Sequence, residues 1–144
     1  MAMRSKTILI AYQDEVGVRS LCSFFHGRGY RVETAQTMSE VIRRIRKGHV
    51  DVMLMDDELE GVKACELVSL FKKMNHRVQV IVISSEESLG GVKRLRGAGI
   101  FYQAMKPVDM GEVGSAVACA FEKIERENGR AGFFSFLIPE LSPA

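Results

Sequence analysis

Short apolar runs suited to β-strands alternate along this chain with runs that repeat apolar residues at helical spacing. The strand-like runs cover residues 8–12, 31–35, 50–55, 78–83 and 101–104. A stretch with apolar residues at helical spacing follows each of these runs. It is clearest after the first run, where one helix face would carry Val18, Leu21, Cys22 and Phe25. This order of strand–helix units predicts right-handed crossovers and a doubly wound parallel sheet of five strands.

Composition limits the chain to one domain with an ordinary core. It has 144 residues, of which 47% are hydrophobic and 26% are charged. That profile is typical of a single globular domain. The net charge is only +2, which gives no strong reason to expect nucleic acid or an anionic membrane as partner. Two basic clusters, at residues 43–47 and 93–96, are interpreted as solvated helix faces, because no nucleic-acid-reading motif accompanies them.

The N-terminus and the cysteines predict a cytoplasmic protein with reduced thiols. Residues 1–6 are followed by only a short apolar run, which is too short for a signal peptide. No run approaches the length that spans a membrane. The three cysteines, Cys22, Cys65 and Cys119, are odd in number and widely spaced among apolar neighbours. This pattern favours core thiols over disulfides or a zinc site.

Four polar residues stand at the ends of apolar runs. Asp14, Asp56, Ser84 and Lys106 each come at or just after such an end. Because the carboxyl ends of parallel strands open onto one crevice, these side chains are expected to meet there. Alone, each has a structural interpretation, such as a helix N-terminal carboxylate for Asp14 or an ion pair between Asp56 and Lys106. Together they predict a site that accepts a phosphoryl group.

At these positions the chain resembles the receiver domain of bacterial two-component response regulators, over about residues 6–128. The resemblance implies a flavodoxin-like (βα)5 fold, with Asp56 as phosphoacceptor for a histidine kinase or a phosphotransfer protein. Lys106 and Ser84 would contact the phosphoryl group. Asp14, Asp56 and the backbone carbonyl of Glu58 would hold Mg²⁺. Such a domain is a signalling switch with self-catalysed transfer and hydrolysis only, not an enzyme in the usual sense.

The chain departs from the receiver pattern at several positions. Gln13 stands where the first acid of a pair is usual, so it would reach the metal only weakly, through water. Asp57 and Glu58 follow the acceptor and would either restore acidity or remain solvated loop charges. Glu60 replaces a common proline, which predicts a loop of different shape. Gln103 replaces a common aromatic switch residue.

These departures keep other functions open. A pseudo-receiver would act as a protein interaction module without phosphorylation, and Gln13 is the feature that separates it from the switch. A flavin-binding electron carrier would share only the fold class, and no phosphate-binding loop follows the first strand. The output, the cognate kinase and the pathway are not encoded in any recognisable motif, so a downstream protein partner or effector domain is expected.

Two further regions carry predictions. The helix expected at residues 86–96 contains Gly90 and Gly91, each costing roughly 1 kcal/mol against alanine. It should be the least stable element and, with the last strand and the helix after Asp109, should form the output surface. The last helix is expected to end near Asn128-Gly129, so that residues 1–128 form the domain. Residues 129–144 would be an apolar tail or the start of a linker. The tail would pack on its own domain, on a neighbouring domain or on a second copy of the chain, and a homodimer contact is preferred among these.

Overall fold

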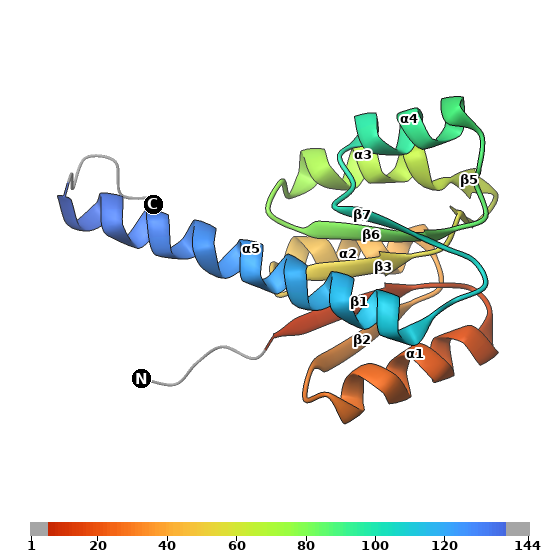
Figure 1. Ribbon diagram of the computed structural model, residues 1–144, viewed down its shortest axis with the longest axis horizontal. Helices are drawn as coiled ribbons and strands as arrows, with labels where there is room; N and C mark the ends of the chain where they lie inside the picture. Colours follow the sequence, from red (N-terminus) through yellow and green to blue (C-terminus); the bar gives the residue numbers. More distant parts are fainter. Residues whose placement is uncertain (1–5, 138–144) are drawn as a thin grey trace.

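A five-stranded parallel sheet forms the centre of the molecule. The computed structural model describes residues 6–137, and their side chains as far as residue 129 (Figure 1). The strands lie in the order β2 (Arg31–Ala35), β1 (Thr7–Ala11), β3 (Val52–Met55), β6 (Gln79–Ser84) and β7 (Tyr102–Met105). All neighbouring pairs in this sheet are parallel. The predicted single α/β domain with a doubly wound sheet is confirmed.

Helices cover both faces of the sheet. Helices α1 (Glu15–Gly27) and α5 (Met110–Leu137) pack on one face, where Ile8 and Ile10 of β1 point. Helices α2 (Met38–Lys47), α3 (Ala64–Met74) and α4 (Leu89–Ala98) pack on the other face, with Leu9 and Ala11. This alternation along β1 follows the two-residue period of a strand. Burial on both faces explains why the central strands read as continuous apolar runs.

Helix α2 begins and ends as its sequence predicts. The Thr37 hydroxyl accepts a hydrogen bond from the amide of Glu40 at 3.2 Å, while the Glu40 carboxylate accepts one from the amide of Gln36 at 3.3 Å. This arrangement is close to the expected capping box, in which a side chain satisfies free amides at a helix start. Gly48 ends the helix with φ 78, a conformation that glycine adopts without strain.

Three expectations were wrong in detail. Helix α4 begins at Leu89 with Ser88 as its N-cap, rather than at residue 86. Helix α5 does not end near Asn128-Gly129 but continues to Leu137, because one glycine lowers helix stability without ending it. Cys119 is exposed rather than a core thiol. Within residues 6–137, no helix is long and apolar enough to cross a membrane.

One element was not expected. Strands β4 (Glu58–Leu59) and β5 (Val62–Lys63) form a small antiparallel hairpin between β3 and α3. Its two turn residues, Glu60 and Gly61, have φ values of 50 and 78. Two consecutive residues with positive φ are typical of the tight turns that join hairpin strands. The loop after Asp56 is therefore an ordered hairpin.

Candidate functional site

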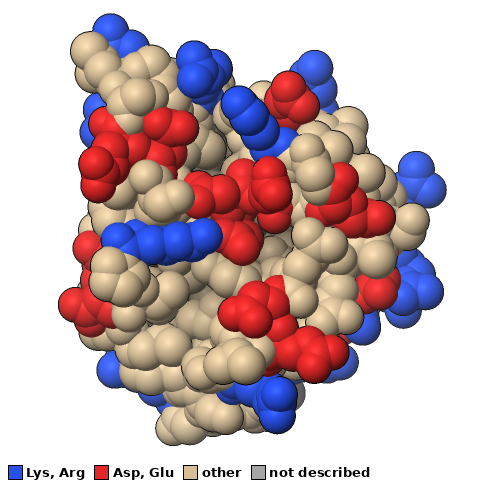
Figure 2. Space-filling model, turned by 90° about the vertical axis from the view of Figure 1, so that its right-hand side faces the viewer, with Lys and Arg blue, Asp and Glu red and all other residues tan. Residues whose placement is uncertain are grey.

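The candidate site lies at the carboxyl ends of β1, β3, β6 and β7. Viewed from that side, acidic side chains gather near the middle of the surface with basic side chains beside them (Figure 2). Asp56 directly follows β3, Ser84 is the last residue of β6, and Lys106 directly follows β7. The parallel pairing of β3 with β6 and of β6 with β7 aligns these strand ends. The predicted meeting of Asp56, Ser84 and Lys106 at one edge therefore follows from the register of the sheet.

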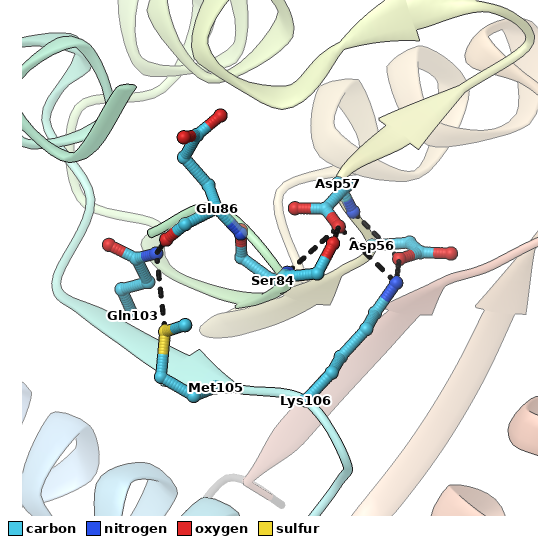
Figure 3. Close-up of polar contacts among 8 residues, drawn as sticks. Asp56, Asp57, Ser84, Glu86, Gln103, Met105 and Lys106 are labelled. Atoms are coloured by element: carbon cyan, nitrogen blue, oxygen red, sulfur yellow. Dashed lines mark hydrogen bonds and ion pairs between the residues drawn. The ribbon is translucent and has the colours of Figure 1, made fainter. Parts of the chain in front are cut away.

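Asp56 and Lys106 form the closest charged contact of the site. The Lys106 Nζ atom lies 2.5 Å from Asp56 Oδ1, and the Lys106 side chain extends from the end of β7 toward both neighbouring carboxylates (Figure 3). The same Asp56 oxygen accepts a hydrogen bond from the amide of Asp57 at 2.7 Å. Partial burial would lower the pKa of Lys106, but the hydrogen bond and the charges of Asp56 and Asp57 outweigh it, so the pKa is raised. Lys106 thus stays a fixed positive charge at neutral pH.

Asp57 is the second carboxylate of the site and turns toward β6. Its Oδ2 atom accepts hydrogen bonds from the amide and the hydroxyl of Ser85, both at 3.0 Å, and lies 3.4 Å from Lys106 Nζ. Burial alone would raise the pKa of Asp57, but hydrogen bonds from Ser84 and Ser85 and the charge of Lys106 lower it below its ordinary value. Asp57 is therefore a bound group and not a solvated loop charge.

Ser84 connects this site to the segment that leads into α4. The residue is fully buried, and its hydroxyl accepts a hydrogen bond from the amide of Glu86 at 2.9 Å. The carbonyl of Glu86 in turn accepts a hydrogen bond from Gln103 Nε2 at 3.0 Å (Figure 3). The partly buried side chain of Gln103 thus has a hydrogen-bond partner on the backbone, which a buried polar group needs.

Asp14 and Gln13, the other two residues assigned to the metal, point to backbone amides. The Asp14 carboxylate caps α1 by accepting a hydrogen bond from the amide of Gly17 at 3.1 Å. Gln13 Oε1 accepts one from the amide of Glu60 at 3.1 Å. Each contact engages one side-chain oxygen atom that a hard cation would use as a ligand.

The residues as placed do not fit a Mg²⁺ site. Among the described residues, no three His, Cys, Asp or Glu side chains come together in a group that would hold a metal ion. The Asp56 carboxylate is already neutralised by Lys106. The assignment of Asp14, Asp56, the Glu58 carbonyl and Gln13 to a metal therefore stays a prediction.

Tyr12 is a residue of the site that sequence reasoning missed. Ala11 of β1 pairs with Met55 of β3, so the next residues, Tyr12 and Asp56, follow adjacent strand ends. Tyr12 is 5% exposed, and its hydroxyl has no hydrogen-bond partner among the described residues. Burial, followed by the charges of Asp56, Asp57 and Asp14, raises its pKa, so the phenol stays neutral. The signal in the sequence was its place as the first polar residue after β1.

The tip of the hairpin is tied to two other segments. Glu60 Oε1 accepts a hydrogen bond from the amide of Met38, the first residue of α2, at 2.5 Å. The Glu60 amide is the group that donates to Gln13. A carboxylate at a helix start also interacts favourably with the helix dipole. These contacts compensate for the positive φ of Glu60 and fix the loop that follows Asp56.

An open pocket of about 230 Å³ lies beside Asp57. The hairpin, the start of α3 and α4 supply its walls, which include Asp57, Lys63, Cys65, Ser85, Glu86 and Arg94. Both signs of charge are present in this lining. The pocket opens the Asp57 side of the site to solvent.

Comparison with known proteins shows the family to which the chain is similar. Residues 8–118 match the family model described as the response regulator receiver domain. The polar-differentiation response regulator DivK of Brucella ovis is 23% identical over 109 residues, covering 74% of this chain and 88% of DivK. The DNA-binding transcriptional regulator NtrC of a Bradyrhizobium species is 26% identical over 147 residues, covering 99% of this chain and 30% of NtrC.

A solved structure shows the same fold. The CheY-like response regulator receiver domain protein from Methanospirillum hungatei superimposes with a TM-score of 0.79 at 25% identity, covering 85% of this chain and 98% of that one. The chain thus spans most of DivK but less than a third of the transcriptional regulator NtrC.

Proposed function

Because this chain belongs to the family of response regulator receiver domains, we propose that it is a signalling switch that accepts a phosphoryl group on Asp56. The contact between Asp56 and Lys106, at 2.5 Å, carries this proposal. It places a fixed positive charge against the acceptor, and the hydroxyl of Ser84 ends the neighbouring strand. A histidine kinase or a phosphotransfer protein would supply the phosphoryl group.

The proposed transfer needs little from the protein beyond position and charge. A carboxylate oxygen of Asp56 attacks the phosphorus atom of a phosphohistidine, the P–N bond breaks, and the imidazole leaves with the electron pair and takes up a proton. The product is an aspartyl phosphate. Lys106 offsets the negative charge of the transferring group, which is the main contribution that a protein makes to phosphoryl transfer.

Intact-mass spectrometry with phosphoramidate as donor tests the proposal. The wild-type protein should gain the mass of one phosphoryl group, and Asp56→Asn should gain none. Asp57→Asn is the matched control, because it removes the adjacent carboxylate by the same change. A gain that disappears with Asp57→Asn and survives in Asp56→Asn would show that the acceptor is misassigned.

A phosphorylation-independent interaction module is the second candidate. The observation that favours it is the scarcity of carboxylates for a metal ion after β1. The first two residues after this strand, Tyr12 and Gln13, carry no carboxylate, and the carboxylate of Asp14 caps α1. The same labelling experiment, run with Mg²⁺ and with a chelator, separates the two functions. If the folded wild-type protein gains no mass in either condition, the interaction module is supported. The family match leaves no support for the flavin-binding alternative.

The proposed partners follow from either function. Receiver domains interact with kinases or with effector domains, so a kinase or phosphotransfer protein upstream and a protein partner or effector domain downstream are proposed here. A cytoplasmic location is part of the same proposal. The predicted homodimer contact through residues 129–144 falls almost entirely outside the described side chains and stays a prediction.

A further inference from the structure

Three hydrogen-bond donors surround one carboxylate oxygen of Asp57. Asp57 Oδ2 accepts hydrogen bonds from the Ser85 amide and the Ser85 hydroxyl and lies near Lys106 Nζ. Ser84, which precedes Ser85, is fully buried at the end of β6. An amide, a hydroxyl group and an ammonium group around one oxygen atom form an anion site. Here the anion is a side chain of the protein itself.

The backbone of Asp57 holds the carboxylate in this position. Its amide donates to Asp56 Oδ1 at 2.7 Å, and its carbonyl accepts a hydrogen bond from the amide of Ala64 at 2.7 Å. Both backbone groups are thus bonded to fixed elements, the end of β3 and the start of α3. With the main chain fixed, the short side chain has few rotamers and reaches β6 without a flexible stem.

We propose that the carboxylate of Asp57 is a built-in anion that takes the place of a phosphoryl group and holds Ser84, Ser85 and Lys106 in their anion-bound arrangement. The assignment of Ser84 and Lys106 to phosphoryl binding rests on the proposed function. The convergence of donors on Asp57 does not, because it consists of contacts between residues of the protein itself. In a phosphorylated switch, the Asp57 carboxylate would compete with the phosphoryl group for these donors. In an interaction module, it would bind the same donors permanently.

A continuous set of contacts links Asp57 to the start of α4. The Ser84 hydroxyl accepts from the Glu86 amide, and Glu86 Oε1 accepts from the Ser88 amide at 2.9 Å and from the Ser88 hydroxyl at 2.6 Å. Ser88 caps α4 by accepting a hydrogen bond from the amide of Gly91 at 3.0 Å. Each link fixes the next, so loss of the Asp57 charge should loosen the chain from Ser84 into α4.

Hydrogen exchange on the unphosphorylated protein tests this inference. Asp57→Asn keeps the size of the side chain but removes its charge, and should raise exchange at Ser85, Glu86 and α4 by about fivefold, as expected for loss of one net hydrogen bond. Ser85→Ala removes one donor at an exposed position and should produce a smaller increase in the same segment. Glu87→Gln removes an exposed charge two residues beyond Ser85 and should leave exchange unchanged.

Two results would overturn the inference. The first is unchanged exchange in Asp57→Asn. The second is an equal increase in Asp56→Asn, because Asp56 shares Lys106 with Asp57 but does not contact Ser85, so the charge balance at Lys106 would then be the cause. The phosphorylation of Asp56 by phosphoramidate, followed by intact-mass spectrometry, has an outcome that is independent of this hydrogen-exchange measurement. A protein that gains no phosphoryl group but loosens in Asp57→Asn would support the built-in anion while contradicting the switch.

Discussion

Lys106 Nζ binds Asp56 Oδ1 across a separation of 50 residues, and the same ammonium group lies 3.4 Å from Asp57 Oδ2. One lysine thus contacts two consecutive carboxylates at the end of β3, and its single positive charge offsets part of their combined negative charge. Removing the lysine would leave two like charges side by side, whereas removing either acid would leave an intact ion pair. Lys106 is therefore the residue on which the charge balance of the site depends.

Lys106→Met should destabilise the protein by about 1–2 kcal/mol at neutral pH, since it leaves partly buried carboxylates without their partner. Solvent screening keeps the loss below that of a fully buried pair. Urea unfolding monitored by circular dichroism measures the change. Lys73→Met, at an exposed position of α3, is the control and should change stability by less than about 0.5 kcal/mol. Equal losses of stability in the two variants would mean that the contacts of Lys106 with the two carboxylates contribute nothing specific to the free energy of unfolding.

The stability contributed by Asp57 should be lost in acid. Its pKa is lowered in the folded protein from an ordinary value of 3.8, so folding favours the charged form. The contribution is therefore fully present above that ordinary value and disappears as the pH falls through the lowered folded pKa. Urea unfolding of the wild type and Asp57→Asn should differ most at neutral pH and converge in acid. A difference that grows on acidification would contradict the assigned direction.

Gln13→Asp should strengthen Mg²⁺ binding relative to the wild type, because the residues as placed do not fit a Mg²⁺ site and the change adds a carboxylate, the ligand that a hard cation prefers. Isothermal titration calorimetry with Mg²⁺ provides the measurement. Glu15→Gln, in the first turn of α1, removes a nearby charge but leaves residues 12–14 unchanged. It therefore controls for a general electrostatic effect on Mg²⁺ binding. Unchanged affinity in Gln13→Asp would place this side chain outside any metal site.

Tyr12→Phe should leave stability unchanged or raise it by up to about 1 kcal/mol, since a buried hydroxyl without a partner costs free energy that phenylalanine avoids. Thermal unfolding gives the comparison. Tyr30→Phe provides a reference for loss of a tyrosine hydroxyl away from the site. A clear destabilisation by Tyr12→Phe would show that the hydroxyl does find a partner in solution.

Gly97→Ala should stabilise α4 by about 1 kcal/mol, because alanine has the higher helix propensity. A Cβ atom at Gly97 would meet nothing within 4 Å. The same change at Gly91 should not help, since its Cβ would lie 2.2 Å from Cδ of Glu86. Hydrogen exchange of residues 89–98 should therefore slow in Gly97→Ala and not in Gly91→Ala. Slower exchange in both variants would mean that Glu86 moves freely.

The sheet and the main site residues were accessible from sequence because both depend on local patterns. Apolar runs, a capping box at Thr37 and polar residues at strand ends need only neighbouring positions to be recognised. The order of the parallel strands then brings Asp56, Ser84 and Lys106 together. The resemblance to receiver domains rests on these same positions, and the family match confirms it.

Other features depend on contacts that no local pattern reports. Asp57 was open to interpretation as a loop charge, because its partner Ser85 lies 28 residues away on another strand end. The hairpin turn at Glu60 is compensated by Gln13 and by the start of α2, which are equally remote. Tyr12 was read as part of a strand because its aromatic ring fits an apolar run. Helix α5 passes through Gly129 although that residue looked like an end signal.

The hairpin at residues 58–63 also bears on how readily the acceptor side of the molecule can be recognised. A segment whose tip is anchored at Gln13 and Met38 has already lost its conformational freedom in the unbound protein. A kinase or effector that docks over Asp56 would therefore meet a preformed surface and would lose little entropy in ordering it. Shape complementarity to this rigid rim, rather than induced folding of a loop, would then decide which proteins are accepted as partners.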